Sequence, residues 1–269
     1  VVENPIVSII TSVALEHTRI LGDTIEKIAH HKSGIIKYRK PVIIGQLPID
    51  AVTVVKEKAV EEQSALYVYG EHFHLEQDFQ GERYTNNQNN KNIAQLQRRL
   101  LGNHQGHNMS LAITAFFEVA KTFHLEVNDD FIRNAVANAT LPARFEQVYP
   151  KVYFDGAHNP ASVEKLVKTI QQQFPNENIR FVIGMVADKD VKTVLKLLER
   201  ISDEFYFVDF ENPRAAKAQQ LFDLSNAKKK EVLHDSVSFI QSSTDFNGIT
   251  FVTGSLYLLA EIRSKLIHV

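Results

Sequence analysis

The alternation of short apolar runs with amphipathic helical stretches in the second half of the chain is the feature that most constrains its fold. Such a series, without hairpin signals, predicts one parallel, doubly wound sheet with helices on both faces. No Gly-x-Gly-x-x-Gly follows any run, so the usual dinucleotide-binding turn is not predicted. The predicted strands are 152–154, 179–184, 205–209, 231–233 and 249–253, and the predicted helices are 160–173, 190–200, 217–225, 235–243 and 255–266.

The first half shows the same alternation less regularly. Asp23, with Glu26 three residues later, predicts a carboxylate version of the capping box at a helix start. Apolar residues from Met109 to Ala120 keep the 3.6-residue spacing of a helix packed on a core. The polar run 85–92 predicts a mobile hairpin tip rather than a site. The other predicted elements are strands 6–11, 41–45 and 66–69, a helix at about 50–62 and a helix from about 128.

Residues 139–142, Ala-Thr-Leu-Pro, interrupt the helical pattern and predict a domain boundary. We therefore expect two domains, 1–142 and 143–269, as the length of 269 residues allows. The chain opens without methionine and runs into the apolar strand 6–11, which needs neighbours on both sides. We therefore expect a C-terminal fragment whose first sheet continues in upstream residues.

Charge and composition exclude several classes of protein. A net charge of -2 and an isoelectric point near 6.6 give no electrostatic case for nucleic acid or an anionic membrane as partner. The sequence has no cysteine, which excludes a disulfide scaffold, thiol catalysis and a cysteine-based zinc site. No apolar run reaches the roughly 18 residues of a membrane span, and no signal-peptide pattern is present. We expect a cytoplasmic protein.

The hexapeptide 155–160, Asp-Gly-Ala-His-Asn-Pro, follows a predicted strand directly. Asn159 is suited to cap the next helix and Pro160 to occupy its first turn. The turn would gather the carboxylate of Asp155, the imidazole of His158 and backbone donors at the carboxyl end of a strand, where open α/β sheets bind ligands. The alternative is a plain capped strand–helix turn.

Several further patches accompany this hexapeptide in a fixed order. They are Ser-Val-Ala-Leu-Glu-His at 12–17, Leu-Gly-Asp-Thr at 21–24, Lys-Ser-Gly-Ile-Ile-Lys at 32–37, Gly-Asn-His-Gln at 102–105 with Asn108, Pro-Ala-Arg-Phe-Glu at 142–146, Gly-Met-Val-Ala-Asp-Lys-Asp at 184–190 and Thr-Gly-Ser-Leu-Tyr at 253–257. Over essentially the whole chain, this ordered set resembles folylpolyglutamate synthase and dihydrofolate synthase, of the Mur ligase superfamily. The resemblance implies an α/β fold in which an incomplete P-loop-type ATPase central domain, 1–142, precedes a Rossmann-like, doubly wound C-terminal glutamate ligase domain, 143–269.

The resemblance also implies an activity. It is an ATP-dependent ligation in which a carboxylate of folate or dihydropteroate becomes an acyl phosphate and the amine of L-glutamate then displaces phosphate. Phosphoryl transfer needs cations on the phosphate oxygens, and aminolysis needs stabilisation of an oxyanion. ATP and Mg²⁺ are the implied cofactors, and we expect a monomer.

Two residues of the first half are implied at a metal site. The resemblance makes His17 a ligand of the second Mg²⁺, although Mg²⁺ generally prefers oxygen and a loop histidine bonded to the backbone is the alternative. The family motif reads Asp-His where this chain has Glu16. Lys32 matches a carbamylated lysine, and carbamylation requires a neutral, partly buried amine. Its alternative is a solvated lysine at a helix C-terminus, and His31 replaces the family's usual glutamate before it.

The remaining implied residues contact the nucleotide or the reacting groups. Asn108 matches the adenine-binding position, with an amide near a helix start as the alternative. Arg144 matches an arginine suited to phosphate, and it is a surface residue instead if Ala143 cannot adopt the conformation of the family's glycine. Asp155 matches a nucleotide contact, and His158 is placed to face ATP or the acyl phosphate. A helix-start histidine bonded to a carbonyl is the alternative for His158.

No Gly-x-x-x-x-Gly-Lys-Ser/Thr occurs in the 269 residues. If the resemblance holds, the P-loop and most of the folate pocket lie upstream. Two other functions stay open at this point. One is a cell-wall Mur-type ligase that adds an amino acid to a UDP-linked peptide, and the other is a non-catalytic nucleotide-binding module.

Overall fold

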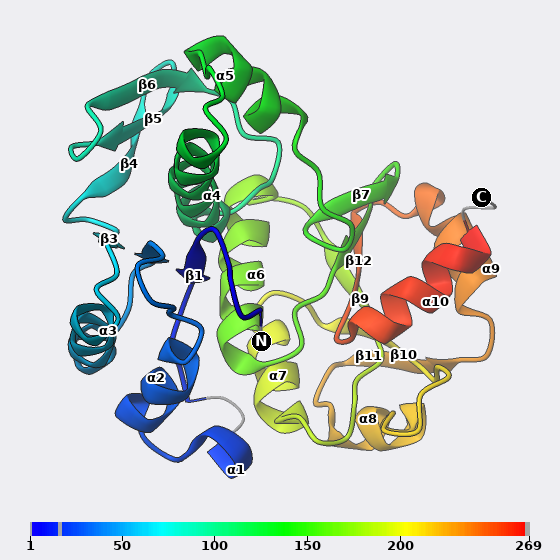
Figure 1. The fold of residues 1–269 in the computed structure, drawn as a ribbon. Helices are drawn as coiled ribbons and strands as arrows, with labels where there is room; N and C mark the ends of the chain where they lie inside the picture. Colours follow the sequence, from blue (N-terminus) through cyan, green and yellow to red (C-terminus); the bar gives the residue numbers. More distant parts are fainter. Residues whose placement is uncertain (1, 16–17, 267–269) are drawn as a thin grey trace. The chain divides into compact units, whose positions relative to one another are not determined.

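The computed structural model describes residues 2–15 and 18–266, and the chain divides into two compact units (Figure 1). Unit 1 comprises Val1–Arg99 and Asn103–Ala139, and unit 2 comprises Leu100–Gly102 and Thr140–Val269. Unit 1 contains two sheets and unit 2 contains one, and each unit has its own hydrophobic clusters. No helix in the described ranges is long and apolar enough to cross a lipid bilayer.

Unit 1 combines a parallel and an antiparallel three-stranded sheet. The parallel sheet has the order β1-β2-β3, and its central strand is Val-Ile-Ile, fully buried because both faces are covered. Helices α2 and α3 cover one face, and α4 covers the other. The strands are β1 (Ser8–Ile10), β2 (Val42–Ile44), β3 (Leu66–Val68), β4 (Phe73–Asp78), β5 (Gly81–Asn86) and β6 (Lys91–Leu96), and the helices are α1 (Thr18–Leu21), α2 (Ile25–Ser33), α3 (Ile49–Glu61), α4 (Asn103–Thr122) and α5 (Asp129–Asn138).

Three predictions for unit 1 need correction. The N-cap of α2 is Thr24, which accepts a hydrogen bond from the N–H of Lys27, whereas Asp23 forms an ion pair with the Lys27 side chain at 2.8 Å. The polar run 85–92 does contain a hairpin turn, but its ends belong to β5 and β6, two strands that the sequence analysis did not predict. Helix α4 begins at Asn103, six residues before the apolar spacing becomes visible.

Unit 2 is built on a six-stranded sheet with the order β11-β10-β9-β12-β8-β7. Five strands are parallel, as predicted, and β7 pairs antiparallel with β8. Strand β7 was not predicted because it is short, half polar and separated from β8 only by Pro150 and Lys151. The strands are β7 (Glu146–Tyr149), β8 (Val152–Asp155), β9 (Ile179–Ile183), β10 (Glu204–Val208), β11 (Lys229–Leu233) and β12 (Ile249–Thr253).

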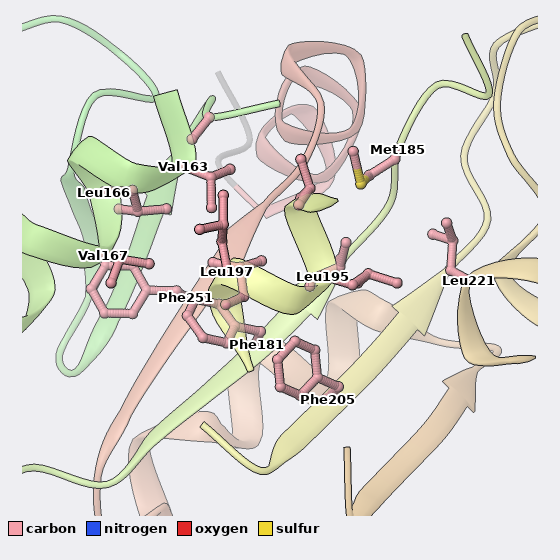
Figure 2. Packing of buried hydrophobic residues seen from close by; sticks show 14 of the residues in the cluster. Val163, Leu166, Val167, Phe181, Met185, Leu195, Leu197, Phe205, Leu221 and Phe251 are labelled. Carbon is pink, nitrogen blue, oxygen red and sulfur yellow. The ribbon is translucent and has the colours of Figure 1, made fainter. Parts of the chain in front are cut away.

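Helices cover both faces of this sheet, so it is doubly wound. Phe181, Phe205 and Phe251 point to the face covered by α6, α7 and α8 (Figure 2), while their neighbours Val182 and Val252 point to the face covered by α9 and α10. The alternation follows from the two-residue period of a strand. The helices are α6 (Pro160–Gln173), α7 (Val191–Leu198), α8 (Ala218–Leu224), α9 (Ser236–Gln241) and α10 (Leu256–Leu266), with a 3₁₀ turn at Ser242–Asp245.

Candidate functional site

Asp155 is the last residue of β8, and its carboxylate stands at the carboxyl edge of the sheet. Each of its oxygens accepts a backbone hydrogen bond of 2.9 Å, one from the N–H of Phe145 and one from the N–H of Ala157. Burial raises the pKa of Asp155 above its ordinary value, and the two donors and the charges of Arg144 and His158 offset only part of that rise. The carboxylate is therefore held in one orientation at the edge where such sheets bind ligands.

Arg144 packs against the turn of the hexapeptide. Ala143 has a φ of 58°, in the left-handed region that favours glycine, so the alanine does adopt a glycine-like conformation. The Nη1 of Arg144 donates to the carbonyl of Ala143 at 3.1 Å, and a Cβ built on Gly156 would lie 2.6 Å from the same Nη1. The half-buried guanidinium thus lies beside Asp155 and not free in solvent.

His158 has a defined ring orientation. Its Nδ1 lies 2.8 Å from the carbonyl oxygen of Gly156, and its backbone N–H donates to Oγ of Ser162 at 3.1 Å. Because a carbonyl only accepts, Nδ1 is assigned the proton, and Nε2 is the nitrogen left for chemistry. The carbonyl bond is the one that the structural alternative for His158 predicted. It does not exclude a role in chemistry, because it leaves the ring half-buried at the same turn as Asp155.

The ends of β8, β12 and β9 are joined by hydrogen bonds along this edge. The N–H of Gly254 donates to the carbonyl of Ala157 at 3.0 Å, and the N–H of Gly184 donates to the carbonyl of Thr253 at 3.4 Å. Gly254 has a φ of 103°, and a Cβ there would lie 2.7 Å from the carbonyl oxygen of Gly184. Only glycine fits this close approach without strain.

The loop between β10 and α8 also reaches this edge, and the sequence analysis did not single it out. An antiparallel bridge between Val186 and Ala215 fastens it to the loop after β9. The Asn-Pro dipeptide at 212–213 signals a turn in the sequence. Nothing in that signal shows that the turn lies beside residues almost 30 positions earlier.

Lys32 lies near the end of α2, as predicted, and is half-buried. Its Nζ donates to the carbonyl of Ser12 at 2.8 Å. Ser12 follows β1, so the amine of Lys32 lies at the carboxyl end of that strand. His17 and Glu16 follow in the same segment but lie outside the described residues.

Asn108 lies in the second turn of α4, because the helix begins earlier than the apolar spacing suggests. Its side chain is exposed. Its Nδ2 donates to Oε1 of Gln105 at 3.1 Å. Gln105 and Ser110 are among the buried residues of α4, so Asn108 occupies its solvent-facing side.

Of the predicted site residues, Arg144, Asp155 and His158 gather at one end of the sheet in unit 2, while Lys32 and Asn108 belong to unit 1. Within residues 2–15 and 18–266, no group of three or more His, Asp or Glu side chains is arranged to hold a metal ion. The prediction for His17 as a metal ligand falls outside that range.

Comparison with known proteins identifies relatives along the whole chain. Residues 143–246 match the family model described as Mur ligase, glutamate ligase domain. The chain is 35% identical to a dihydrofolate synthase/folylpolyglutamate synthase of Bacillus subtilis and 32% identical to a folylpolyglutamate synthase of Lacticaseibacillus casei, in each case over 98% of its own length. It spans 64% of the length of the first relative and 62% of the second.

Solved structures of similar fold include proteins of the same kind. The chain superposes on Escherichia coli FolC in complex with DHPP and ADP with a TM-score of 0.82 and 28% identity, covering 97% of this chain and 61% of that one. It superposes on a folylpolyglutamate synthase of Thermotoga maritima with a TM-score of 0.80 and 28% identity, covering 98% and 61%. A complex of a Mycobacterium tuberculosis folylpolyglutamate synthase with ADP and AMPPCP matches with a TM-score of 0.79 and 25% identity, covering 97% and 63%.

Proposed function

Because this chain is homologous to the folylpolyglutamate and dihydrofolate synthases and carries a Mur ligase glutamate ligase domain, we propose that its protein is an ATP-dependent ligase that adds L-glutamate to a folate or to dihydropteroate. One observation carries the proposal. The domain that matches the glutamate ligase model gathers Asp155, His158 and Arg144 at the carboxyl end of β8. A carboxylate, an imidazole and a guanidinium together suit a reaction in which a phosphoryl group is transferred to a carboxylate and an amine then displaces phosphate.

The geometry supports a separate role for each of these side chains. Arg144 offers a planar, permanently charged donor set, which suits phosphate oxygens. His158 presents Nε2 to exchange a proton or a hydrogen bond with the reacting groups, since its Nδ1 is engaged by Gly156. Asp155 holds the N–H groups of Phe145 and Ala157, so it fixes the two turns on which Arg144 and His158 stand.

Nucleotide binding is supported by the neighbours that contain ADP or AMPPCP. ATP would supply the phosphoryl group that activates the pterin-linked carboxylate. We propose that the exposed amide of Asn108 contacts the adenine, because its helix face is open to a ligand. Unit 1 then corresponds to the C-terminal part of the ATP-binding domain and unit 2 to the ligase domain. The two units meet between Ala139 and Thr140, three residues before the boundary expected from the sequence.

The described residues support Mg²⁺ binding less well than they support nucleotide binding. The described residues supply no three-ligand cluster, so we derive no step through the metal. Lys32 contributes a half-buried amine beside Ser12, and we propose that it carries the carbamate implied by the family resemblance. A high-resolution density map of the intact protein tests this directly, because a carbamate adds three atoms beyond Nζ. Density that ends at a bare amine would exclude it.

The activity is tested by mass spectrometry of pterin products. The intact protein that contains this chain is incubated with ATP, Mg²⁺, L-glutamate and either dihydropteroate or a tetrahydrofolate. We expect products heavier by one glutamyl residue, formed only with ATP. Ligation to a UDP-linked peptide instead would indicate a cell-wall ligase, and nucleotide binding without any ligation would indicate a non-catalytic module. Either result overturns the proposal.

Two further expectations from the sequence belong to the same proposal. The protein acts as a monomer, which light scattering after gel filtration tests at micromolar concentration. It acts in the cytoplasm, which fractionation of source cells tests. A dimer or a membrane-pellet location would contradict them separately, without affecting the ligase activity.

A further inference from the structure

We propose that Glu146 is a positioning residue for the ligation. Its carboxylate holds the backbone turn 143–145 in a strained conformation and thereby fixes the direction of the Arg144 guanidinium. The inference rests on the proposed function, because it explains how one side chain that is proposed to act on phosphate is held in place. Glu146 ends the Pro-Ala-Arg-Phe-Glu patch at 142–146, in which only Arg144 is implied as a functional residue.

The backbone on both sides of Arg144 is strained. Ala143 has a φ of 58° and Phe145 has a φ of 47°, so two residues that carry a Cβ occupy the left-handed region. This conformation costs free energy for residues such as alanine and phenylalanine, and it persists only where the surroundings hold it. The turn 143–145 therefore needs contacts that prevent it from relaxing.

Hydrogen bonds hold both ends of this turn. The N–H of Phe145 donates to Oδ2 of Asp155 at 2.9 Å, and the N–H of Gly156 donates to the carbonyl of Ala143 at 2.9 Å. The N–H of Ala143 donates to Oε2 of Glu146 at 2.8 Å. Asp155 thus holds one end of the turn, and Glu146 holds the other.

The carboxylate of Glu146 is itself fixed by a second partner. Its Oε1 accepts from Nη1 of Arg263 at 2.5 Å, and the two side chains are only 24% and 36% exposed, so solvent screens the pair less than a fully exposed one. Arg263 belongs to α10, whose residues Leu259 and Ile262 are buried in the apolar cluster on that face of the sheet. One oxygen of Glu146 is therefore anchored to a packed helix, while the other is directed at the turn.

Ala143 connects Glu146 to the guanidinium. Its N–H bonds to Glu146, and its carbonyl accepts from Nη1 of Arg144 at 3.1 Å. If the backbone relaxes at Ala143, this carbonyl rotates away from Nη1. Gly156 leaves little room for adjustment, because a Cβ built there would lie 2.6 Å from the same nitrogen. Without Glu146, Arg144 keeps its charge but loses its fixed direction, which should slow the step in which charge develops more than it weakens ATP binding.

Steady-state kinetics of the intact protein test the inference. We expect Glu146→Ala to lower kcat by about 10- to 100-fold, the scale for a displaced functional group, with KM for ATP and for L-glutamate within about threefold. Arg263→Ala removes the ion pair but leaves the acceptor for Ala143, so its effect should be smaller. The matched control is Glu199→Ala, which removes a glutamate that accepts from the N–H of Asn226 at 2.7 Å at the opposite edge of the sheet and should leave kcat unchanged.

Two double variants separate positioning from a general loss of stability. Glycine adopts a positive φ without strain, so Ala143→Gly added to Glu146→Ala should restore most of the lost turnover. In an Arg144→Ala background, Glu146→Ala should cause little further loss, because a positioning residue acts only through the group that it positions. A loss that glycine does not restore, or that multiplies the loss in Arg144→Ala, would overturn the inference as a merely structural effect. A kcat of Glu146→Ala within about twofold of wild type would also overturn it, while the ligase activity stands.

Amide hydrogen exchange tests the contact itself, without turnover. Ala143 stands in a turn before β7, where an amide that faces only solvent would exchange rapidly. We expect the Ala143 amide to be protected in the wild type and in Glu199→Ala, and to lose that protection in Glu146→Ala. An unprotected Ala143 amide in the wild type would reject the inference, because Glu146 would then hold nothing.

Discussion

Arg144 is the single residue for which we expect the largest effect on turnover. Arg144→Ala in the intact protein should lower kcat by roughly 10²–10³, the scale for loss of one donor to a developing charge. The fold should persist, because the hydrogen bond of this side chain is to the carbonyl of its own neighbour, Ala143. Steady-state rates at saturating ATP, together with circular dichroism, measure both effects. Arg200→Ala, which removes an exposed arginine at the amino edge of the same sheet, is the control. Near-normal turnover of Arg144→Ala would show that Arg144 is only a surface residue.

Asp155 should leave a signature in the pH dependence of stability. Burial raises its folded pKa above the ordinary value of 3.8, so the folded state holds the proton more tightly than the unfolded state. Between those two pKa values the folded state binds more protons, and this carboxyl group therefore lowers stability as pH rises through the interval. Asp155→Asn lacks the titration but keeps one acceptor oxygen.

The corresponding measurement is a difference between two proteins. Urea unfolding of wild type and Asp155→Asn at several pH values from about 3.5 to 7 gives the free energy of unfolding of each. The advantage of wild type over the variant should shrink as pH rises. The hydrogen bond lost in the variant adds an offset that does not depend on pH. An advantage that grows with pH would show that the two N–H donors and the nearby cations outweigh burial.

At the scale of elements, helix α6 depends on its cap. Oδ1 of Asn159 accepts from the N–H of Ser162 at 2.8 Å, and Oγ of Ser162 accepts from the N–H of Asn159 at 3.1 Å, which completes a capping box. Asn159→Ala should lower the free energy of unfolding by about 0.5–2 kcal/mol, while Asn159→Asp should cost much less. Chemical denaturation measures both. Equal losses for the two variants would mean that the cap bond is not what stabilises the start of α6.

The same elements show what sequence can and cannot predict. The parallel strands of unit 2 were predictable because apolar runs, turns and caps repeat along the chain, and their carboxyl ends then bring Asp155 and His158 to one edge. The edge strand β7 and the antiparallel sheet β4–β6 were missed because their strands carry few apolar residues, and in β5 two of the three buried positions are the polar residues Glu82 and Asn86. The first turns of α4 were missed for a similar reason, since Asn103 and His104 have no apolar spacing.

Site residues could be placed together from the sequence only where a single turn carries several functional side chains. The hexapeptide places its own carboxylate and imidazole by local geometry. The loop between β10 and α8 reaches the same edge through the bridge between Val186 and Ala215, and that pairing depends on the order of strands in the sheet. The local residue composition does not show which distant loops lie next to each other in the folded sheet. Thr24, and not Asp23, is the N-cap of α2, and the Asp23 side chain pairs with Lys27 instead. Residue spacing alone does not show which of the two neighbouring side chains caps the helix.

At the scale of the whole molecule, the question is whether unit 2 contains all the packing that it needs to fold by itself. Unit 2 contains a complete sheet with helices on both faces and two large apolar clusters. Phe251, on the central strand β12, lies 5.2 Å from Phe145 and 6.1 Å from Phe181 between ring centroids. Burial of this kind needs no contribution from unit 1, because Leu101, which packs against the same cluster from outside residues 140–269, also belongs to unit 2.

We therefore expect residues 140–269, expressed alone, to fold and to unfold in one cooperative transition. Phe251 is fully buried, so Phe251→Ala should lower the free energy of unfolding of this polypeptide by about 3–5 kcal/mol, whereas removal of an exposed aromatic ring in Tyr257→Ala should cost far less. Denaturation followed by circular dichroism and by dispersed NMR resonances measures both. A collapsed state without dispersed resonances would show that the core of unit 2 is not sufficient, and that the division of the chain into two units does not extend to folding.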